Sequence, residues 1–313
     1  MGTPEFAVET LKALVENDYN VVAVVTQPDK PVGRHQTEMQ PSQVKQYAVA
    51  HGLPVLQPEK MKDPEFVEQL RSYNANLQVV VAFRMLPEVV GAMPEYGTFN
   101  VHAALLPQYR GAAPINWAVI NGETQTGVTT FFLDHDIDTG RIILKKTFDI
   151  PDEADVEYVY DGLMHLGAEI CLETLEAIVA ANGHPDSIPQ DSVLDGSAIK
   201  PAPKIFKETC EIDWQKTAKQ VYDFVRGLSP YPGAWTTLVA PDGKETVLKI
   251  YKTRKTGKPG KGIGTITIEG KALCVSAADE QLEIVELQLA GKKRMMARDF
   301  LNGMKQIEDY RVK

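Results

Sequence analysis

Asn100 and His102 are separated by one residue in a segment that has the pattern of a strand end. Because side chains alternate along a strand, we expect both to point to the same side. The carboxyl ends of strands in open α/β sheets are where ligands bind. An amide and an imidazole in that place could stabilise negative charge and move protons. Taken alone, however, an Asn-x-His pair is more often structural than catalytic.

A second polar cluster, residues 133–140, follows a predicted strand at 127–132. It contains Asp134, Asp136 and Asp138, whose alternate spacing is similar to that of a calcium loop. The glycine and the closing glutamate that such a loop requires are misplaced, so we expect no metal. The favoured interpretation is an oriented pair of histidine and aspartate, formed if the two strands are neighbours in the sheet.

The elements that must position these residues alternate between strands and helices. Near-continuous apolar runs at 21–26 and 77–82 indicate strands buried on both faces. Further strands are predicted at 127–132 and 141–148, and amphipathic helices at 6–16, 43–51, 63–72 and 156–181. The pattern predicts an α/β fold with a Rossmann-like, mostly parallel sheet and flanking helices. No G-x-G-x-x-G motif follows a strand, which argues against a dinucleotide-dependent dehydrogenase.

Residues 184–205 are rich in Pro, Ser and Asp without sustained periodicity, which indicates a linker. Beyond it, a helix is predicted at 217–228 and short strands at 235–239, 247–253, 262–268, 272–276 and 282–289. This spacing predicts a small closed β-barrel that is OB-like. The expected division is therefore a catalytic domain at 1–183, a linker at 184–205 and a barrel domain at 206–313.

Net charge differs in sign between the two parts of the chain. Residues 1–205 contain 14 Lys and Arg against 28 Asp and Glu, a charge of −14, and residues 206–313 contain 19 against 14, a charge of +5. The second part could therefore face a polyanion. Its runs of Lys and Arg fit either phosphate contacts or an ordinary solvated face. The positive net charge of this part favours phosphate contacts.

Length and composition fit a globular enzyme. A chain of 313 residues exceeds the usual size of one hydrophobic core, so two domains are expected. No run approaches the roughly 18 apolar residues of a membrane-spanning helix, and the first residues lack the features of a signal peptide. Three distant cysteines suit a reducing compartment. We expect a cytoplasmic monomer without membrane association.

Several motifs resemble those of methionyl-tRNA formyltransferases, a branch of the folate-dependent formyltransferases. They lie at residues 2–7, 26–29, 100–114, 138–140, 212–214 and 290–293, so the resemblance covers essentially the whole chain. It implies 10-formyltetrahydrofolate as the donor and the amino group of methionyl initiator tRNA as the acceptor, in support of translation initiation. Asn100, His102 and Asp138 match the catalytic positions of the family.

The implied reaction needs these residue types. When an amine attacks the formyl carbon, negative charge develops on the carbonyl oxygen, and each donor from Asn100 or His102 would stabilise it by roughly 3–4 kcal/mol. The amine must lose a proton while the folate nitrogen gains one, which requires a general acid and base. We expect Asp138 to orient and charge His102 and to order a water that relays the proton.

The resemblance also implies a folate site. The donor would lie against Ala104, Leu105, Leu106 and Pro107, with its pterin near Arg84, Met85 and Leu86. Ala104 stands where family members usually carry serine, which would weaken folate binding only if the serine acts through its hydroxyl. Arg84 fits a pterin contact and a solvated charge equally well.

Residues for tRNA contact come from two sources. The resemblance implies Arg34, in a loop that meets the acceptor end of the tRNA in this family, although a plain surface loop fits as well. The two basic runs of the second domain contribute Lys249, Lys252, Arg254, Lys292 and Lys293. If these side chains meet phosphates, tRNA binding should depend strongly on salt.

Two other classes of function stay open. A formyltransferase that acts on a small amine, such as a purine precursor or an amino sugar, would share every motif of the first half, but it needs no basic C-terminal barrel. A nucleic-acid-binding module with an α/β scaffold is the second alternative. The combination of Asn100, His102 and Asp138 argues against it.

The first residues predict a turn from a strand into a helix. Gly2 permits the tight geometry, and Pro4 suits the start of the helix at 6–16. Because such a turn follows a strand, we expect that the natural chain begins upstream of Met1 with a central apolar strand. Without that strand the protein should be only marginally stable, with a gap beside residues 21–26.

Overall fold

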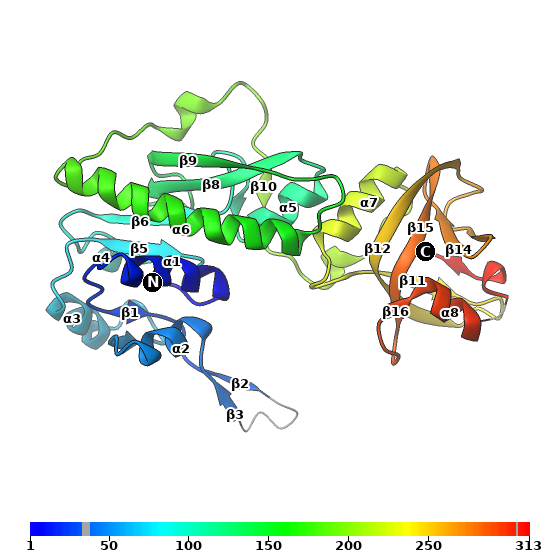
Figure 1. Ribbon diagram of the computed structural model, residues 1–313, viewed down its shortest axis with the longest axis horizontal. Coiled ribbons are helices and arrows are strands. Elements are labelled where there is room, and N and C mark those ends of the chain that lie inside the picture. The colour runs from blue at the N-terminus through cyan, green and yellow to red at the C-terminus, as the bar shows by residue number, and fades with distance from the viewer. Residues whose placement is uncertain (33–37, 305) are drawn as a thin grey trace. The chain divides into compact units, whose positions relative to one another are not determined.

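The computed structural model of the chain describes residues 1–32, 38–304 and 306–313. They form two compact units, which can be followed along the chain in Figure 1. Unit 1 contains residues 1–111, 125–149 and 160–201, and unit 2 contains residues 112–124, 150–159 and 202–313. Most of the expected linker therefore belongs to unit 1, and two short segments from the first half of the chain belong to unit 2.

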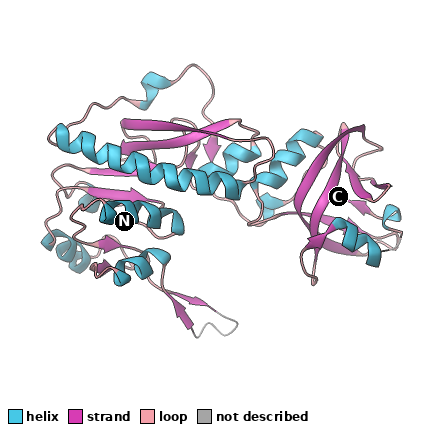
Figure 2. Cartoon of the chain, viewed as in Figure 1, coloured by secondary structure: helices cyan, strands magenta, loops and turns pink. Residues whose placement is uncertain are grey.

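Unit 1 has the mixed α/β composition that its sequence pattern predicts (Figure 2). Its helices are α1 (Glu5–Glu16), α2 (Gln43–Ala50), α3 (Pro64–Ser72), α4 (Glu88–Gly91) and most of α6 (Val156–Ala180). Its strands are β1 (Val24–Val25), β2 (Lys30–Val32), β3 (Glu38–Gln40), β4 (Val55–Leu56), β5 (Gln78–Val81), β6 (Thr98–His102), β7 (Arg110–Gly111), β8 (Gln125–Phe132) and β9 (Ile142–Asp149). Helices α2 and α3 begin where Ser42 and Asp63 cap the first backbone N–H groups.

Four strands form the main sheet of unit 1, in the order β5-β6-β8-β9. β5 and β6 are parallel, whereas the pairs β6·β8 and β8·β9 are antiparallel. The prediction of a mostly parallel sheet is therefore wrong for β8 and β9. The connection between them is the short loop 133–141, and a parallel crossover would need a dozen or more residues.

Helix α6 packs on one face of this sheet. The hydroxyl groups of Thr130 in β8 and Thr174 in α6 are hydrogen-bonded at 2.8 Å in the buried interface. A side chain at Gly167 would lie 3.4 Å from both Val101 and Phe6, so the helix approaches β6 and α1 closely at this glycine. The contact packs α6 against β6, the strand that carries Asn100 and His102.

Beside β5 the sheet is interrupted. Strands β1 and β4 form a separate parallel pair, and Met1 and Gly2 lie between this pair and β5. Gly2 N–H donates to Val25 O at 3.0 Å, and Val81 N–H donates to Met1 O at 2.9 Å. Through these bonds, Met1 and Gly2 pair with their neighbours as strand residues do. Helix α1 begins at Glu5, directly after Pro4. The turn predicted at the first residues is thus present.

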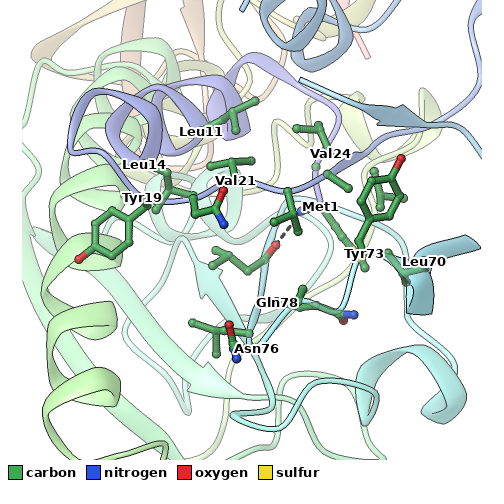
Figure 3. Close-up of a pocket in the computed structure, with 18 of the residues that line it drawn as sticks. Met1, Leu11, Leu14, Tyr19, Val21, Val24, Leu70, Tyr73, Asn76 and Gln78 are labelled. Atoms are coloured by element: carbon green, nitrogen blue, oxygen red, sulfur yellow. Dashed lines mark hydrogen bonds between the residues drawn. The ribbon is translucent and has the colours of Figure 1, made fainter. Parts of the chain in front are cut away.

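A cavity of about 750 Å³ extends from Met1 between β1 and β5 (Figure 3). Its walls come from α1, α3, α6 and the facing edges of the two strands. In the view of Figure 3, Met1 lies between Val24 and Gln78. Residues 21–23 of the predicted strand line the cavity, and the strand is regular only at Val24–Val25, where β4 pairs with it.

Unit 2 is built on a curled antiparallel sheet, in the order β13-β14-β15-β12-β11-β17. Its strands are β11 (Ala234–Val239), β12 (Glu245–Pro259), β13 (Ile266–Glu269), β14 (Ala272–Ser276), β15 (Glu280–Leu289), β16 (Met295–Met296) and β17 (Arg311–Val312), with β10 (Pro201–Ala202) preceding them. A bridge between Thr265 and Arg311 brings the two edges of the sheet together. The helices are α5 (Pro114–Ile120), α7 (Ala218–Gly227) and α8 (Ala297–Gly303).

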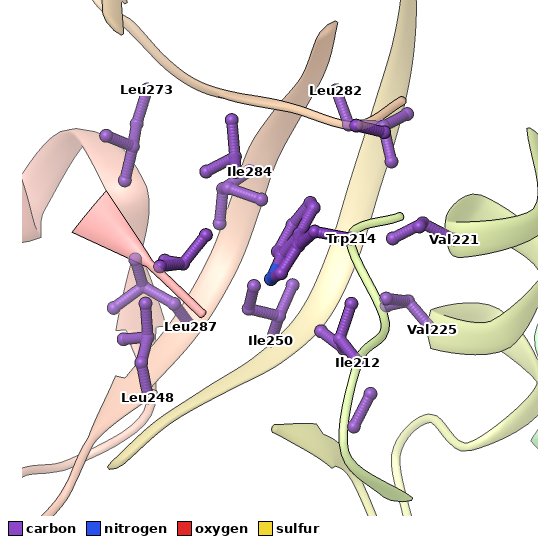
Figure 4. Packing of buried hydrophobic residues seen from close by; sticks show 14 of the residues in the cluster. Ile212, Trp214, Val221, Val225, Leu248, Ile250, Leu273, Leu282, Ile284 and Leu287 are labelled. Carbon is purple, nitrogen blue, oxygen red and sulfur yellow. The ribbon is translucent and has the colours of Figure 1, made fainter. Parts of the chain in front are cut away.

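The core of unit 2 lies inside the curled sheet. Figure 4 shows Trp214 surrounded by aliphatic side chains of the strands, among them Ile250 and Ile284. The Trp214 indole N–H donates to Thr236 Oγ1 at 2.9 Å, so its polar atom is satisfied inside the core. Among the residues that the structure describes, no helix of either unit is long and apolar enough to cross a membrane.

The segment 150–159 is fixed to α7 by buried polar contacts. Tyr222 Oη donates to Asp152 O at 2.9 Å, and Arg226 Nη1 donates to Ala154 O at 3.0 Å. Arg226 also pairs with Asp223 at 2.8 Å, and both side chains are buried. These contacts explain why a segment from the first half of the chain belongs to unit 2.

Candidate active site

The pairing of β6 places Asn100 and His102 as the sequence predicts. Asn100 lies opposite Phe131 and His102 opposite Thr129 in the neighbouring strand β8. Both side chains leave the strand on the same side, because they are two residues apart. The His102 ring packs edge-on against Phe131, with 6.3 Å between ring centres, and its side chain is buried. The imidazole therefore has little freedom to turn.

His102 lies between a backbone carbonyl and a carboxylate. Its Nε2 is hydrogen-bonded to Tyr109 O at 2.9 Å, and because a carbonyl only accepts, Nε2 carries the hydrogen in this bond. Its Nδ1 faces Asp138 Oδ2 at 3.8 Å, and the two side chains are 7% and 13% exposed. The structure thus brings His102 and Asp138 together, at a separation that a bridging water or a small shift would close.

The loop of Asp138 is held in an unusual conformation. Asp138 has a φ of 56°, in the left-handed region that costs a non-glycine residue about 1 kcal/mol. Its Oδ2 accepts a hydrogen bond from Gly111 N–H at 3.0 Å. The other acidic residues of the loop, Asp134 and Asp136, are exposed. Over the described residues there is no group of His, Cys, Asp and Glu that could hold a metal ion.

Asn100 carries an unsatisfied polar atom. Its Oδ1 is buried and has no hydrogen-bond partner among the described residues. Leaving a buried acceptor unpaired costs about 1–3 kcal/mol, so such atoms are rare and require an explanation. A ligand with a hydrogen-bond donor, such as an amine, would satisfy it.

The residues expected at the folate site differ in access. Ala104 and Leu106 are fully buried, and Leu106 packs in a core with Phe131 and Ile142. The Thr129 hydroxyl donates to Ala104 O at 2.6 Å and accepts from Leu106 N–H at 3.1 Å, which fixes this run. Pro107 is buried and Leu105 is half-buried, so Leu105 is the member of this run with side-chain surface for a ligand.

The second expected part of the folate site is more open. Met85 is 69% exposed, and Leu86 packs against the core beneath β1 and β4. The Arg84 guanidinium donates to the carbonyls of Pro58 and Glu59, the latter at 2.9 Å, and lies over the Phe83 ring. Arg84 is therefore neither a freely solvated charge nor a group whose whole donor set is open to a pterin.

The residues expected to contact tRNA lie in unit 2, except Arg34, which is outside the described residues. Lys252 is exposed on β12, and Lys292 and Lys293 are exposed in the turn after β15. Lys249 Nζ donates to Pro232 O at 3.2 Å. Arg254 pairs with Glu283 at 2.7 Å, and because this pair is solvated it would give way to a phosphate at little cost.

Two residues beside the pair of His102 and Asp138, namely Arg110 and Gln190, were not singled out from the sequence. Gln190 is only 3% exposed and is hydrogen-bonded to Arg110 and to the loop of Asp138. It lies in the segment expected to be a linker. The linker-like composition of that segment gave no reason to select Gln190. The one available signal was Arg110 inside the 100–114 motif, because a guanidinium in that place needs a hydrogen-bond partner.

Comparison with known proteins identifies relatives along the whole chain. The family described as Formyl transferase matches residues 1–175, and Formyl transferase, C-terminal domain, matches residues 204–305. The methionyl-tRNA formyltransferase of Parabacteroides distasonis is 59% identical, over 100% of this chain and 97% of that protein. The methionyl-tRNA formyltransferase of Porphyromonas gingivalis is 48% identical, over 97% of this chain and 94% of that protein.

Solved structures share the fold at lower identity. WlaRD, described as a sugar 3N-formyl transferase, has a TM-score of 0.63 and 18% identity, over 93% of this chain and 97% of that one. HypX from Aquifex aeolicus, in complex with tetrahydrofolic acid, has a TM-score of 0.55 and 21% identity, over 81% of this chain and 43% of that one. At these identities the likeness concerns the fold alone.

Proposed function

Since the chain belongs to the methionyl-tRNA formyltransferase family, we propose that it transfers the formyl group of 10-formyltetrahydrofolate to the free amino group of methionyl initiator tRNA. The observation that carries the proposal is the cluster of Asn100, His102 and Asp138, with its buried amide oxygen still unpaired. Such a cluster offers what acyl transfer to an amine requires, namely a hydrogen-bond donor for developing negative charge and groups that move protons.

Each residue of the cluster has a distinct role in this proposal. The Asn100 amide donates to the carbonyl oxygen of the formyl group, and its Oδ1 accepts an N–H of the incoming amine. His102 keeps the hydrogen on Nε2 for Tyr109 O, so Nδ1 is the atom that exchanges a proton with the amine or with a water. Asp138, beside Nδ1, balances the positive charge of the imidazolium that forms. The proton then passes to the departing nitrogen.

The folate would be held against the residues of the expected folate site that have accessible surface, Leu105 and Met85. When bound, it supplies the formyl carbon and leaves as tetrahydrofolate. The unpaired Asn100 Oδ1 and the exposed Met85 side chain fit a ligand with a polar acyl group next to an apolar ring system. Ala104 and Leu106 would shape this site from behind, because both are fully buried.

The choice of acceptor rests on the relatives and on unit 2. Relatives at 48% and 59% identity over nearly the whole chain act on methionyl-tRNA by name, whereas the sugar enzyme WlaRD is 18% identical. Residues 206–313 carry a charge of +5, which suits a phosphate backbone. A cytoplasmic location and a monomeric state stay predictions from the sequence.

A competition between acceptors tests the proposal. The protein is incubated with 10-formyltetrahydrofolate that carries a labelled formyl group and with methionyl initiator tRNA, glycinamide ribonucleotide or a dTDP-linked amino sugar. We expect label on the tRNA and at least a hundredfold less on either small amine. Preferential labelling of a small amine would contradict the proposal.

The proposed role of the basic residues is tested by salt. The logarithm of tRNA affinity should fall linearly with the logarithm of salt concentration, because Lys and Arg release counterions from phosphates. Replacing Lys249, Lys252 and Arg254 by glutamine should flatten this slope by about 2–3. The matched control replaces Lys60, Lys62 and Arg71 of unit 1. An equal slope in the two triple variants would make the first run an ordinary solvated face.

A further inference from the structure

Gln190 is a buried glutamine whose side chain uses all of its hydrogen-bonding capacity. Its Nε2 donates to Asp138 O at 2.7 Å and to Gly140 O at 2.8 Å. Its Oε1 accepts from Arg110 Nε at 3.0 Å and from Arg110 Nη2 at 2.7 Å. The side chain thus ties the 138–140 loop to the segment around Arg110.

The orientation of the Gln190 amide follows from its partners. A turn of the amide by half a revolution would place its NH₂ group against the guanidinium donors of Arg110 and its oxygen against two carbonyl oxygens. All four contacts would then be repulsive. Because the bonds to Arg110 involve a charged donor, they are stronger than bonds between neutral groups. Gln190 is therefore held in one conformation.

Neighbouring contacts bring Gln190 to this place. Ile188 exchanges two backbone hydrogen bonds with Ile142 at the start of β9, each of 2.9 Å. Arg141 Nε donates to Ser187 Oγ at 3.0 Å. The segment before Gln190 is thus paired with the residues that follow the Asp138 loop. Since this segment lies in unit 1, it is part of the site's framework and not a free spacer.

The residues next to Arg110 hold both partners of the candidate pair. Tyr109 O accepts from His102 Nε2 at 2.9 Å, and Gly111 N–H donates to Asp138 Oδ2 at 3.0 Å. One short segment therefore positions the imidazole from one side and the carboxylate from the other. Gln190 links that segment back to Asp138 through the main chain.

We infer that Gln190 is a positioning residue for the formyl transfer proposed above: it fixes the distance between His102 Nδ1 and Asp138 Oδ2 by joining Arg110 to the main chain of Asp138. The inference rests on the proposed function for its effect on turnover, and on the geometry alone for its effect on His102. Without the Gln190 bonds, the left-handed conformation of Asp138 relaxes and its carboxylate moves away from the ring.

The test combines kinetics with a direct view of His102. Gln190→Ala should lower kcat by about 10- to 100-fold with little change in KM for either substrate, since a misplacement of about 1 Å costs rates of this order. The pH titration of His102, followed by NMR of its ring, should shift relative to wild type. In the background Asp138→Asn, Gln190→Ala should lower kcat by less than threefold, because the carboxylate that it positions is already gone.

Two further variants keep the test decisive. Gln281 is a glutamine of unit 2, 1% exposed and also hydrogen-bonded through its amide, so Gln281→Ala is the matched control for loss of a buried amide. It should lower stability and leave kcat and the His102 titration unchanged. Gln190→Glu keeps the bond to Arg110 and places an oxygen against the two carbonyls; it should lower kcat even if Gln190→Ala fails to fold.

The outcomes separate the two claims. If the wild-type protein formylates none of the acceptors, the proposed function fails, and the His102 titration in the Gln190 variants still tests the positioning. If Gln190→Ala and Gln190→Glu leave both kcat and the His102 titration as they are in Gln281→Ala, Gln190 is an ordinary structural residue and the inference is overturned.

Discussion

The two sides of the unit 1 sheet differ in how firmly they are connected. On one side, β5, β6, β8 and β9 are hydrogen-bonded in sequence, with Phe99 and Phe131 almost fully buried and α6 packed across them. On the other side, β1 and β4 contribute two residues each and reach β5 through Met1 and Gly2, beside a cavity of about 750 Å³. The candidate site lies on the connected side. The geometry of the candidate site therefore depends on the connected strands, whereas the cavity beside Met1 leaves room for added stability.

A substitution that disrupts the connected side of the sheet should have the largest effect on stability and turnover. A Cβ added at Gly140 would lie 1.6 Å from Phe132 O, a backbone atom that cannot move aside. We expect Gly140→Ala to cost about 3 kcal/mol of unfolding free energy, and the shift of the Asp138 loop to lower kcat roughly a hundredfold. Denaturant unfolding and steady-state kinetics measure both. Gly91→Ala is the control, because its Cβ would meet its nearest atoms only at 3.9 Å.

Filling the cavity between β1 and β5 should have a smaller effect, and it should change stability alone. Six apolar residues fused before Met1 would continue the parallel pairing that Met1 and Gly2 begin. Six buried side chains at roughly 1.5–3 kcal/mol each, offset by an ordering cost of about 1–2 kcal/mol for each of the six residues, should leave a gain of about 2–3 kcal/mol. The thermal midpoint should rise by roughly 5–10 °C. An extension of six Gly and Ser residues should not change it, and equal midpoints for both extensions would show that the cavity accepts no strand.

The smallest effect is expected in thiol labelling, which measures local opening beside the cavity at Cys171. Burial raises the pKa of the Cys171 thiol to about 12, so its labelling at pH 8 requires local opening. Cys171 lies on α6, one turn before the cavity-lining Leu175. Filling the gap with the apolar extension should slow labelling of Cys171 several-fold and leave Cys210 and Cys274 of unit 2 unchanged. Mass spectrometry of the labelled peptides distinguishes the three sites; an equal effect on all three would contradict a local opening.

Periodicity predicted most helices and strands, because each buries one face. The helix expected at 217–228 is α7, Ala218–Gly227, with Thr217 as its cap, and the strand expected at 272–276 is β14. Periodicity said nothing about direction, so both β8 and β9 were predicted as strands but their antiparallel pairing was not. Of the strand expected at 21–26, only Val24–Val25 is regular, because a strand requires a paired neighbour as well as apolar side chains.

The candidate site was partly predictable for a similar reason. Alternation along a strand put Asn100 and His102 on one side, and a polar loop after the next strand supplied Asp138. Gln190 escaped because its contacts run from a side chain to carbonyl groups 50 and 52 residues away, which no local pattern records. The full burial of Ala104 and Leu106 likewise depends on Thr129 and Phe131 from another strand.

The most direct test of the central claim is the single-turnover rate of formyl transfer from 10-formyltetrahydrofolate to methionyl initiator tRNA by the wild-type protein, Asn100→Ala and His102→Ala, all at saturating substrate. Each substitution should lower the rate at least a hundredfold, which corresponds to the loss of about 3 kcal/mol of transition-state stabilisation, with thermal midpoints close to wild type. A rate close to wild type in either variant would contradict the assignment of Asn100 and His102 to catalysis.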